Sequence, residues 1–456
     1  MIAKAMDTKE VGDRPFLEDI PSLGEDRLPR RIENAGQGSY RIVFEGVEAD
    51  ETRMYVKKLE AAGFVKHAEN KIDDVLFYTY YNDDCVLTVI WTDQRRCTLM
   101  TVTVDPRGMT NLVPPANENT WTKVIESSFT QVGLYYDPDR EANAAYRIMM
   151  YVSGMCYVMR LEDGSFIVID GGYNYELHAD HIYETMKKQA PDPNHIVVAA
   201  WILSHSHGDH IPFFLHFCPK YGDKVTVEKV IHSFPFAEGD GIMKRVRNTF
   251  PDAKFYKSHA GQKYHLRNAE VEILYSFDLW INDVETMKDT NVASQVVTIR
   301  AGGTKFMILG DYGEDGATMM DLYSPQTLKS DVMQLAHHGV SDGSNKMNRI
   351  IGAKYIFWPV AMNMEPLGEM KTGYVYWGKP EGIKHGVPLL TRARNKHVVD
   401  QILDGTVFVA NDDVCVATFR DGVLDVDRYE IFDDYMADRK AVCFDRSQWE
   451  ALLSKK

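Results

Sequence analysis

The feature that most constrains this chain is an apolar run that ends in a cluster of metal-ligand side chains. Residues 195–204 read HIVVAAWILS, and residues 205–210 read HSHGDH. A continuous apolar run of this length is typical of a strand buried on both faces of its sheet. The histidine-rich turn is therefore expected to begin where a buried strand ends.

The side chains in this turn are those that zinc and similar cations bind. Imidazole nitrogen and carboxylate oxygen are both good ligands for such ions. Because His205 and His207 alternate, they can point the same way, while Asp209 and His210 sit just before the next helix. Gly208 is expected to let the turn double back without steric cost. The four side chains can line one pocket, and two ions can share it.

The segments on either side of this turn predict alternating strands and helices. Asp163-Gly164 is a favoured hairpin turn between two apolar runs. Pro212 suits the first turn of a helix, where its missing N–H costs little. Predicted strands are YVMRL, FIVID, VEILYSF, QVVTIR, TKFMILGD, SDVMQL, YIFWPV and TVFVAN, and predicted helices are YELHADHIYETMKKQ and IPFFLHFCPKYG.

The amino-terminal part predicts a separate small domain. One helical pattern, ADETRMYVKKLEAAG, is followed by β-branched and aromatic runs that read as antiparallel strands. We divide the chain into a flexible arm (1–36), a small α+β accessory domain (37–106), a linker (107–122), a larger domain (123–430) and a helical C-terminal tail (431–456). The small domain contains no ligand cluster, and an oligomer contact through it is one expectation.

The net charge and the cysteines limit which partners and which cellular compartment we expect. The formal net charge is −15, which disfavours nonspecific binding of nucleic acid. The six cysteines form no CxxC pair, which indicates buried thiols in a reducing compartment. No signal-peptide core or membrane-length apolar run is present in the sequence. We expect a cytoplasmic protein with a small-molecule, anionic substrate and no membrane partner.

The motif HSHGDH resembles the H-x-H-x-D-H signature of the metallo-β-lactamase superfamily. FIVIDGG, FMILGD and LAHHG resemble the family's other motifs, in the same order along residues 145–340. The paired His-His-Gly and the segment NVASQVVTI look most similar to the branch found in competence proteins and phosphorylcholine esterases. The resemblance implies an α/β fold, an αββα four-layer sandwich with the site at one edge, where the strands end.

The resemblance also implies the roles of individual residues. His205 and His207 would bind a first metal, Asp209 and His210 a second, and Asp311 would bridge them. Of the adjacent His337 and His338, one would be a ligand and the other would face the substrate or support the ligand. Asp170 would orient the motif histidines. The family's third histidine for the first metal is best matched by His232, with His259 and His265 as alternatives.

These residues together predict a hydrolase that uses a metal-bound hydroxide, with Asp209 or Asp311 taking the proton. The expected cofactors are two divalent ions, zinc first, with manganese or iron as alternatives. The basic segment 362–397 favours a small phosphodiester or related ester. The alternatives are a lactone or thioester hydrolase, a di-iron redox protein, and a metal-binding regulator without catalysis.

Overall fold

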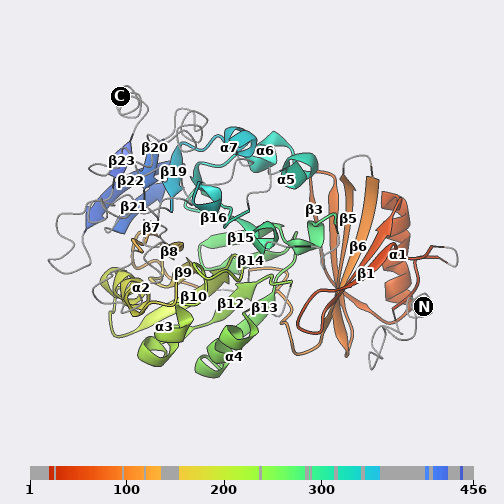
Figure 1. Cartoon of the computed structure of the whole chain (residues 1–456), viewed down its shortest axis with the longest axis horizontal. Coiled ribbons are helices and arrows are strands. Elements are labelled where there is room, and N and C mark those ends of the chain that lie inside the picture. Colours follow the sequence, from red (N-terminus) through yellow and green to blue (C-terminus); the bar gives the residue numbers. More distant parts are fainter. Residues whose placement is uncertain are drawn as a thin grey trace, which may run out of the picture.

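The computed structural model describes most of the chain, with gaps. The described residues are 20–24, 27–94, 97–117, 120–134, 154–235, 239–282, 287, 290–312, 317–339, 345–359, 406–409, 414–429 and 442–444. Within them, the strands form three sheets (Figure 1).

The amino-terminal domain is one antiparallel sheet with a helix on one face. The strands lie in the order β1-β2-β6-β5-β4-β3, and α1 covers the face that carries the apolar side chains of β4, β5 and β6. Glu48 and Glu51 form a capping box that begins α1. The elements are β1 (Arg31–Asn34), β2 (Tyr40–Glu45), α1 (Ala49–Ala61), β3 (Val65–Ile72), β4 (Val75–Tyr81), β5 (Cys85–Gln94) and β6 (Cys97–Pro106).

The larger domain begins with what we call the first sandwich sheet. Its order is β13-β12-β10-β9-β8-β7-β21-β22, with β11 paired to β10, and the run from β13 to β9 is parallel. Its strands are β7 (Ser128–Gln131), β8 (Cys156–Arg160), β9 (Phe166–Asp170), β10 (Ile196–Leu203), β11 (Val225–Val227), β12 (Lys229–His232), β13 (Lys254–Lys257), β21 (Val414–Arg420) and β22 (Val423–Tyr429). Its helices are α2 (Glu176–Gln189), α3 (Phe214–Tyr221) and α4 (Asp240–Thr249).

The second sandwich sheet has the order β14-β15-β16-β17-β18-β19-β20-β23, and it is parallel from β17 to β20. Its strands are β14 (Lys263–Leu266), β15 (Ala269–Tyr275), β16 (Val296–Ala301), β17 (Thr304–Ile308), β18 (Val332–Gln334), β19 (Tyr355–Trp358), β20 (Thr406–Val409) and β23 (Val442–Phe444). Its helices are α5 (Ala317–Leu322), α6 (Pro325–Leu328) and α7 (Asn345–Ile351).

The apolar cores show that the larger domain has four layers. One core lies between the two sandwich sheets and takes side chains from both. A second packs α2, α3 and α4 on the outer face of the first sandwich sheet. A third packs α5 and α7 on the outer face of the second. Figure 1 shows the helices on both outsides. The predicted α/β class and αββα layer order are confirmed, together with the small α+β domain.

A buried set of charges joins the two domains. His259 lies between two carboxylates: Nε2 is 2.5 Å from Asp105 of β6, and Nδ1 is 3.0 Å from Asp278. Burial alone would lower the pKa of His259, but Asp278 and Asp105 raise it to about 10. Nearby, the buried Arg41 of β2 pairs with Glu33 at 2.8 Å and donates to the carbonyl oxygen of Asp278 at 3.2 Å. The small domain is therefore docked partly through buried polar contacts, beside the apolar side chains of Ile72, Val75, Phe77 and Ile90 that pack in the core of the larger domain.

Three sequence predictions need correction or stay outside the described residues. Strand β1 begins at Arg31, inside the predicted arm 1–36, because it pairs with β2. Residues 442–444 of the predicted helical tail are strand β23, which pairs with β20. The basic segment 362–397 lies outside the described residues.

Among the described helices, none is long and apolar enough to cross a membrane.

We expect the docking charges to make stability fall in alkali. The folded pKa of His259, about 10, lies above its ordinary value of 6.5. Its contribution is therefore fully present below pH 6.5 and is lost as pH rises towards 10, at up to about 1.4 kcal/mol per pH unit for one proton. Urea unfolding between pH 7 and pH 10 measures this slope.

Two variants make the assignment specific. His259→Gln should flatten the slope, and Asp105→Asn should cost about 1.5–3 kcal/mol at pH 7, because His259 loses one of its two charged partners and keeps Asp278. Asp74→Asn, at a side chain that is 95% exposed, should change neither quantity by more than about 0.5 kcal/mol. An unchanged slope in His259→Gln would contradict the role of this histidine.

Candidate metal centre

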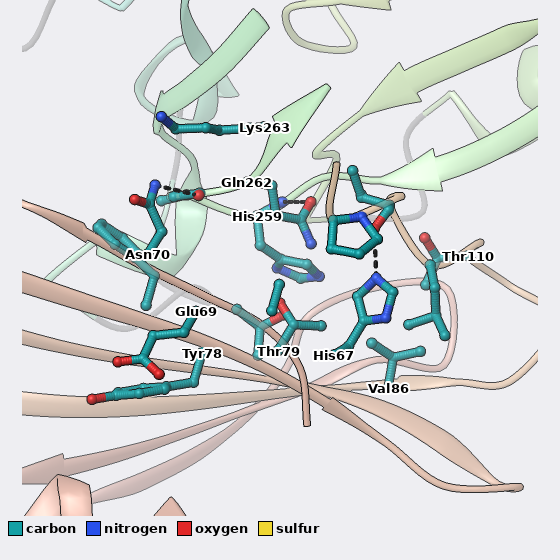
Figure 2. A pocket seen from close by; sticks show the side chains of 18 of the residues that line it. His67, Glu69, Asn70, Tyr78, Thr79, Val86, Thr110, His259, Gln262 and Lys263 are labelled. Atoms are coloured by element: carbon teal, nitrogen blue, oxygen red, sulfur yellow. Dashed lines mark hydrogen bonds between the residues drawn. The ribbon is translucent and has the colours of Figure 1, made fainter. Parts of the chain in front are cut away.

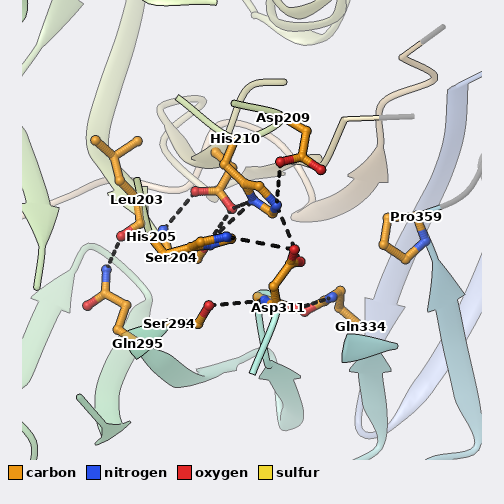
Figure 3. Close-up of polar contacts among 12 residues, drawn as sticks. Leu203, Ser204, His205, Asp209, His210, Ser294, Gln295, Asp311, Gln334 and Pro359 are labelled. Atoms are coloured by element: carbon orange, nitrogen blue, oxygen red, sulfur yellow. Dashed lines mark hydrogen bonds and ion pairs between the residues drawn. The ribbon is translucent and has the colours of Figure 1, made fainter. Parts of the chain in front are cut away.

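The candidate site forms where the carboxyl ends of parallel strands from both sandwich sheets meet. Strands β9 and β10 of the first sheet end at Asp170 and Leu203, so Asp170 and His205 lie side by side. Strand β17 of the second sheet leads into Asp311, and β18 leads into His337 and His338. Segments that are more than 100 residues apart in the sequence thus share one edge (Figure 3).

Glycines allow neighbouring segments to approach closely at this edge, between the two sheets at Gly310 and between β9 and the start of α3 at Gly171. Gly310 has a φ of 57°, and a Cβ there would lie 2.8 Å from the Cβ of Ser204. A Cβ at Gly171 would lie 2.2 Å from the ring of Phe213. Larger residues would force both pairs of segments apart. These glycines explain why the D-G-G and G-D motifs flank the site.

Two groups of side chains present ligand atoms to a common space. Ligand atoms of Asp209, His210, Asp311 and His338 lie within 4.8 Å of one another, and so do those of His205, His207 and Asp311. Asp311 belongs to both groups. Its Oδ1 is 3.3 Å from His210 Nε2, and its Oδ2 is 3.7 Å from His205 Nε2. The predicted bridging position of Asp311 therefore matches the geometry.

Hydrogen bonds behind the histidines fix which ring nitrogen faces the shared space. His210 Nδ1 donates to Asp170 Oδ2 at 2.7 Å, which leaves Nε2 facing Asp311. His338 Nδ1 donates to the carbonyl oxygen of Pro359 at 2.6 Å, which leaves Nε2 3.1 Å from Asp209. Asp170 also accepts from the backbone N–H and hydroxyl of Ser204. This is the arrangement by which proteins orient histidine ligands.

The electrostatics of the site favour positive charge. Burial alone would lower the pKa of His210, but the carboxylates of Asp311, Asp209 and Asp170 raise it well above its ordinary value. Burial alone would raise the pKa of Asp311, but His210 and His338 hold it well below its ordinary value. The carboxylate of Asp311 is therefore ionised and buried, which is costly unless cations lie beside it.

Unpartnered polar atoms show that this donor set fits divalent cations. His205 Nε2, His210 Nε2 and Asp311 Oδ1 are buried and have no hydrogen-bond partner among the described residues. Buried polar atoms rarely lack a hydrogen-bond partner. All three belong to the shared space, and their chemistry matches the preferences of zinc, manganese and iron. Bound cations would satisfy all three.

The structure separates the roles of His337 and His338. His338 is buried and belongs to the four-residue group, whereas the side chain of His337 is 24% exposed and its Nε2 lies 3.9 Å from Asp311. Asn291, the first residue of the segment NVASQVVTI, contacts His337 at 3.2 Å. Both histidines have left-handed backbone, with φ of 46° and 49°, a strain typical of functional sites. His338 thus has the geometry of a ligand, and His337 lies towards the open side.

The structure does not bring His232 into either ligand group, although it was our candidate for the third histidine. It is buried at the end of β12, and its charged surroundings are Lys257, Arg247 and Asp105. The alternatives fail as well, because His259 is held by the docking charges and His265 lies 3.8 Å from Glu270. Within the described residues, the group at the predicted first metal position consists of His205, His207 and the shared Asp311.

The expectation for Gly208 was also wrong. No heavy atom lies within 4 Å of a Cβ built there, and its φ is not left-handed. The turn therefore does not require glycine at this position.

Sequence reasoning missed the buried amides that hold the two strand ends in place. Gln295 donates to the carbonyl oxygen of Leu203 at 2.7 Å, which links the start of β16 to the end of β10. Gln334 accepts from the N–H of Leu309 and donates to the carbonyl oxygen of Gly310. Both glutamines are fully buried. The available sequence signal was a glutamine at the end of an apolar strand pattern.

Comparisons with known proteins give distant likenesses only. No protein-family model matches the chain, and none of the curated proteins matches it. The metallo-β-lactamase fold protein YhfI from Bacillus subtilis is 14% identical, with a TM-score of 0.33 over 51% of this chain and 85% of that chain. A diphosphatase from the PhnP family is 13% identical, with a TM-score of 0.31 over 51% and 85%. Zn²⁺-bound PqqB from Methylobacterium extorquens is 11% identical, with a TM-score of 0.30 over 54% and 76%.

Likenesses this distant carry no argument about what this chain does. The layer order therefore rests on the chain's own strands and cores. Membership of the metallo-β-lactamase superfamily and of its competence and phosphorylcholine-esterase branch stays a prediction.

Replacing the shared carboxylate should remove metal from both groups. Asp311→Asn keeps the shape but loses the charge that both groups use, so we expect zinc content after loading and desalting to fall well below that of the wild type. Elemental analysis measures it. Asp252→Asn, at an exposed aspartate, is the matched control. Zinc content equal to that of the wild type would contradict the shared role.

The two groups should differ in affinity. Four ligands, Asp209, His210, Asp311 and His338, surround one position, whereas His205, His207 and Asp311 surround the other. We expect a chelator to remove zinc in two phases. His207→Gln should abolish the weaker phase and leave the tighter one, and His338→Gln should weaken the tighter one. A single phase in the wild-type protein would contradict this asymmetry.

Proposed function

We propose that this chain is a metal-dependent hydrolase acting on a small phosphodiester or related ester. The observation that carries the proposal is the pair of ligand groups that share the buried carboxylate of Asp311 at an edge formed by both sheets. The predicted residues His205, His207, Asp209, His210, Asp311 and His338 all belong to these groups.

Divalent cations bound there would supply Lewis acidity, which polarises a scissile ester and lowers the pKa of water. Proton transfer would be the role of the chain's own residues. Asp209 is ionised, because His210 and His338 hold its pKa below its ordinary value although burial opposes this. Its side chain is 17% exposed, so it can accept a proton from water.

His337 is placed to act on the substrate. Its partly exposed imidazole lies beside Asp311 and contacts Asn291, so it is held in position without being enclosed. A histidine in such a place can donate a proton to a leaving oxygen or hydrogen-bond to a developing negative charge. We assign it this role, and we assign His338 to metal binding.

The preference for a phosphodiester over a carbonyl ester rests on sequence. Segment 362–397 contains lysines, arginines and histidines in an otherwise acidic chain. Cationic side chains favour phosphate groups. A lactone or thioester hydrolase is the second candidate, because the same metal chemistry serves carbonyl substrates.

Turnover of bis-p-nitrophenyl phosphate by the zinc- or manganese-loaded protein tests the proposal. Thioester and lactone substrates form the parallel arm. We expect hydrolysis of the phosphodiester that is lost in Asp311→Asn. Clear thioester or lactone cleavage without phosphodiester cleavage would favour the carbonyl branch, and no turnover of any of these substrates would count against a hydrolase.

Two variants separate the adjacent histidines. His337→Gln should retain zinc but lose about 10²–10⁴-fold in kcat, the usual contribution of a proton donor. His338→Gln should lose zinc and activity together. His195→Gln, at an exposed histidine, should change neither. Loss of zinc in His337→Gln would mean that we have exchanged the two roles.

A further inference from the structure

A cavity of about 260 Å³ lies between the two domains, apart from the metal centre. Its walls are the sheet of the amino-terminal domain, the segment 110–115 and the segment 257–263 (Figure 2). None of the members of the two ligand groups lines it. The proposed hydrolysis does not use this cavity.

One hydroxyl in the wall of this cavity lacks a partner. Thr88 lies on β5, on the face opposite α1, and it is 2% exposed. Its Oγ1 is buried and has no hydrogen-bond partner among the described residues. A buried unpaired hydroxyl is destabilising, and valine would fill the same volume on a strand without that cost. Because Thr88 lines the cavity, a molecule bound there could supply the missing partner.

The two fully buried cationic groups in the wall, His259 and Lys257, already have partners. His259 is held between Asp105 and Asp278. Lys257 donates to the carbonyl oxygen of Ala35 at 2.8 Å and lies 4.0 Å from Asp105. A charged ligand in the cavity would find no unpaired opposite charge at these groups. The free-energy cost of removing that ligand from water would therefore not be offset. The deep part of the cavity consequently favours an uncharged ligand.

The remaining lining can recognise the edge and the face of such a ligand. Gln262 accepts from the N–H of His259 and the hydroxyl of Tyr264 through Oε1, so its NH₂ group remains for other acceptors. Val86, Val113 and Pro114 supply apolar surface. The volume lies below the range of about 300–1,000 Å³ typical of drug-sized ligands, which suits a single ring.

We propose that this cavity binds a small uncharged single-ring compound whose edge carries hydroxyl or amide groups. Thr88 and Gln262 would bond the polar edge, and the apolar residues would contact the face. Pyranose sugars and free nucleobases share this chemistry.

Calorimetric titration of the full chain tests the proposal. The probes are glucose and galactose in one arm and uracil and adenine in the other, with glucuronate and orotate as charged analogues. We expect at least one uncharged probe to bind with a Kd of about 1 mM or tighter, and its charged analogue to bind about tenfold more weakly. The arm that binds identifies the source of the ring.

Two threonine variants provide the matched comparison. Thr88→Val should weaken binding about tenfold and raise the melting temperature of the ligand-free protein. Thr298 on β16 also has a buried hydroxyl that finds no partner within the described part of the chain, but it does not line the cavity. Thr298→Val should therefore raise the melting temperature and leave binding unchanged.

Three results would overturn the proposal. They are no binding of any uncharged probe up to about 10 mM, equal affinity for the charged analogues, and unchanged affinity in Thr88→Val. Binding should persist in Asp311→Asn. Loss of binding there would place the probe at the metal centre and would likewise overturn the proposal, without bearing on the proposed hydrolysis.

Discussion

The buried carboxylate of Asp311 is the contact on which the candidate site depends. It projects from the second sandwich sheet towards His205 and His210 of the first, and its two oxygens lie 3.7 Å and 3.3 Å from their Nε2 atoms. Several buried histidine and aspartate side chains are packed there. Such a set is stable only when opposite charges balance, and its donor atoms are those that divalent cations prefer.

The frame around this carboxylate reaches the domain interface. Ser258 donates to Gln295 at 2.7 Å, and Gln295 holds the carbonyl oxygen of Leu203, two residues before the first histidine of the motif. His259, the neighbour of Ser258, is held by Asp105 of the small domain. The accessory domain therefore packs on the loop that also supports the end of β10. Its docking face combines these buried charges with the apolar side chains of Ile72, Val75, Phe77 and Ile90, which pack in the same core as α5 and α7.

The local patterns predicted much of the fold and most of the site. Apolar periodicity and turn residues gave the strands at 166–170, 196–203 and 304–308 and the helices around 49–61 and 176–189. The ligand types in HSHGDH, and the resemblance of later motifs, gave the members of both ligand groups. The structure does not bring the predicted His232 into either group. A histidine at a strand end is equally suited to packing, and the sequence does not show which face it occupies. The docking charges and the buried glutamines were missed because their partners lie far away in the sequence.

What the sequence determined by itself is therefore the set of local structures and the chemical kind of the site. Helix and strand periods, turn glycines and ligand side chains act over a few residues, and they can be read from neighbours. Only the tertiary structure decided that His338, and not His337, joins the four-residue group, that His259 belongs to the domain interface, and that a cavity lies between the domains. These outcomes depend on how the sheets and the two domains pack. Packing is set by contacts between residues tens to hundreds of positions apart, which no local pattern records.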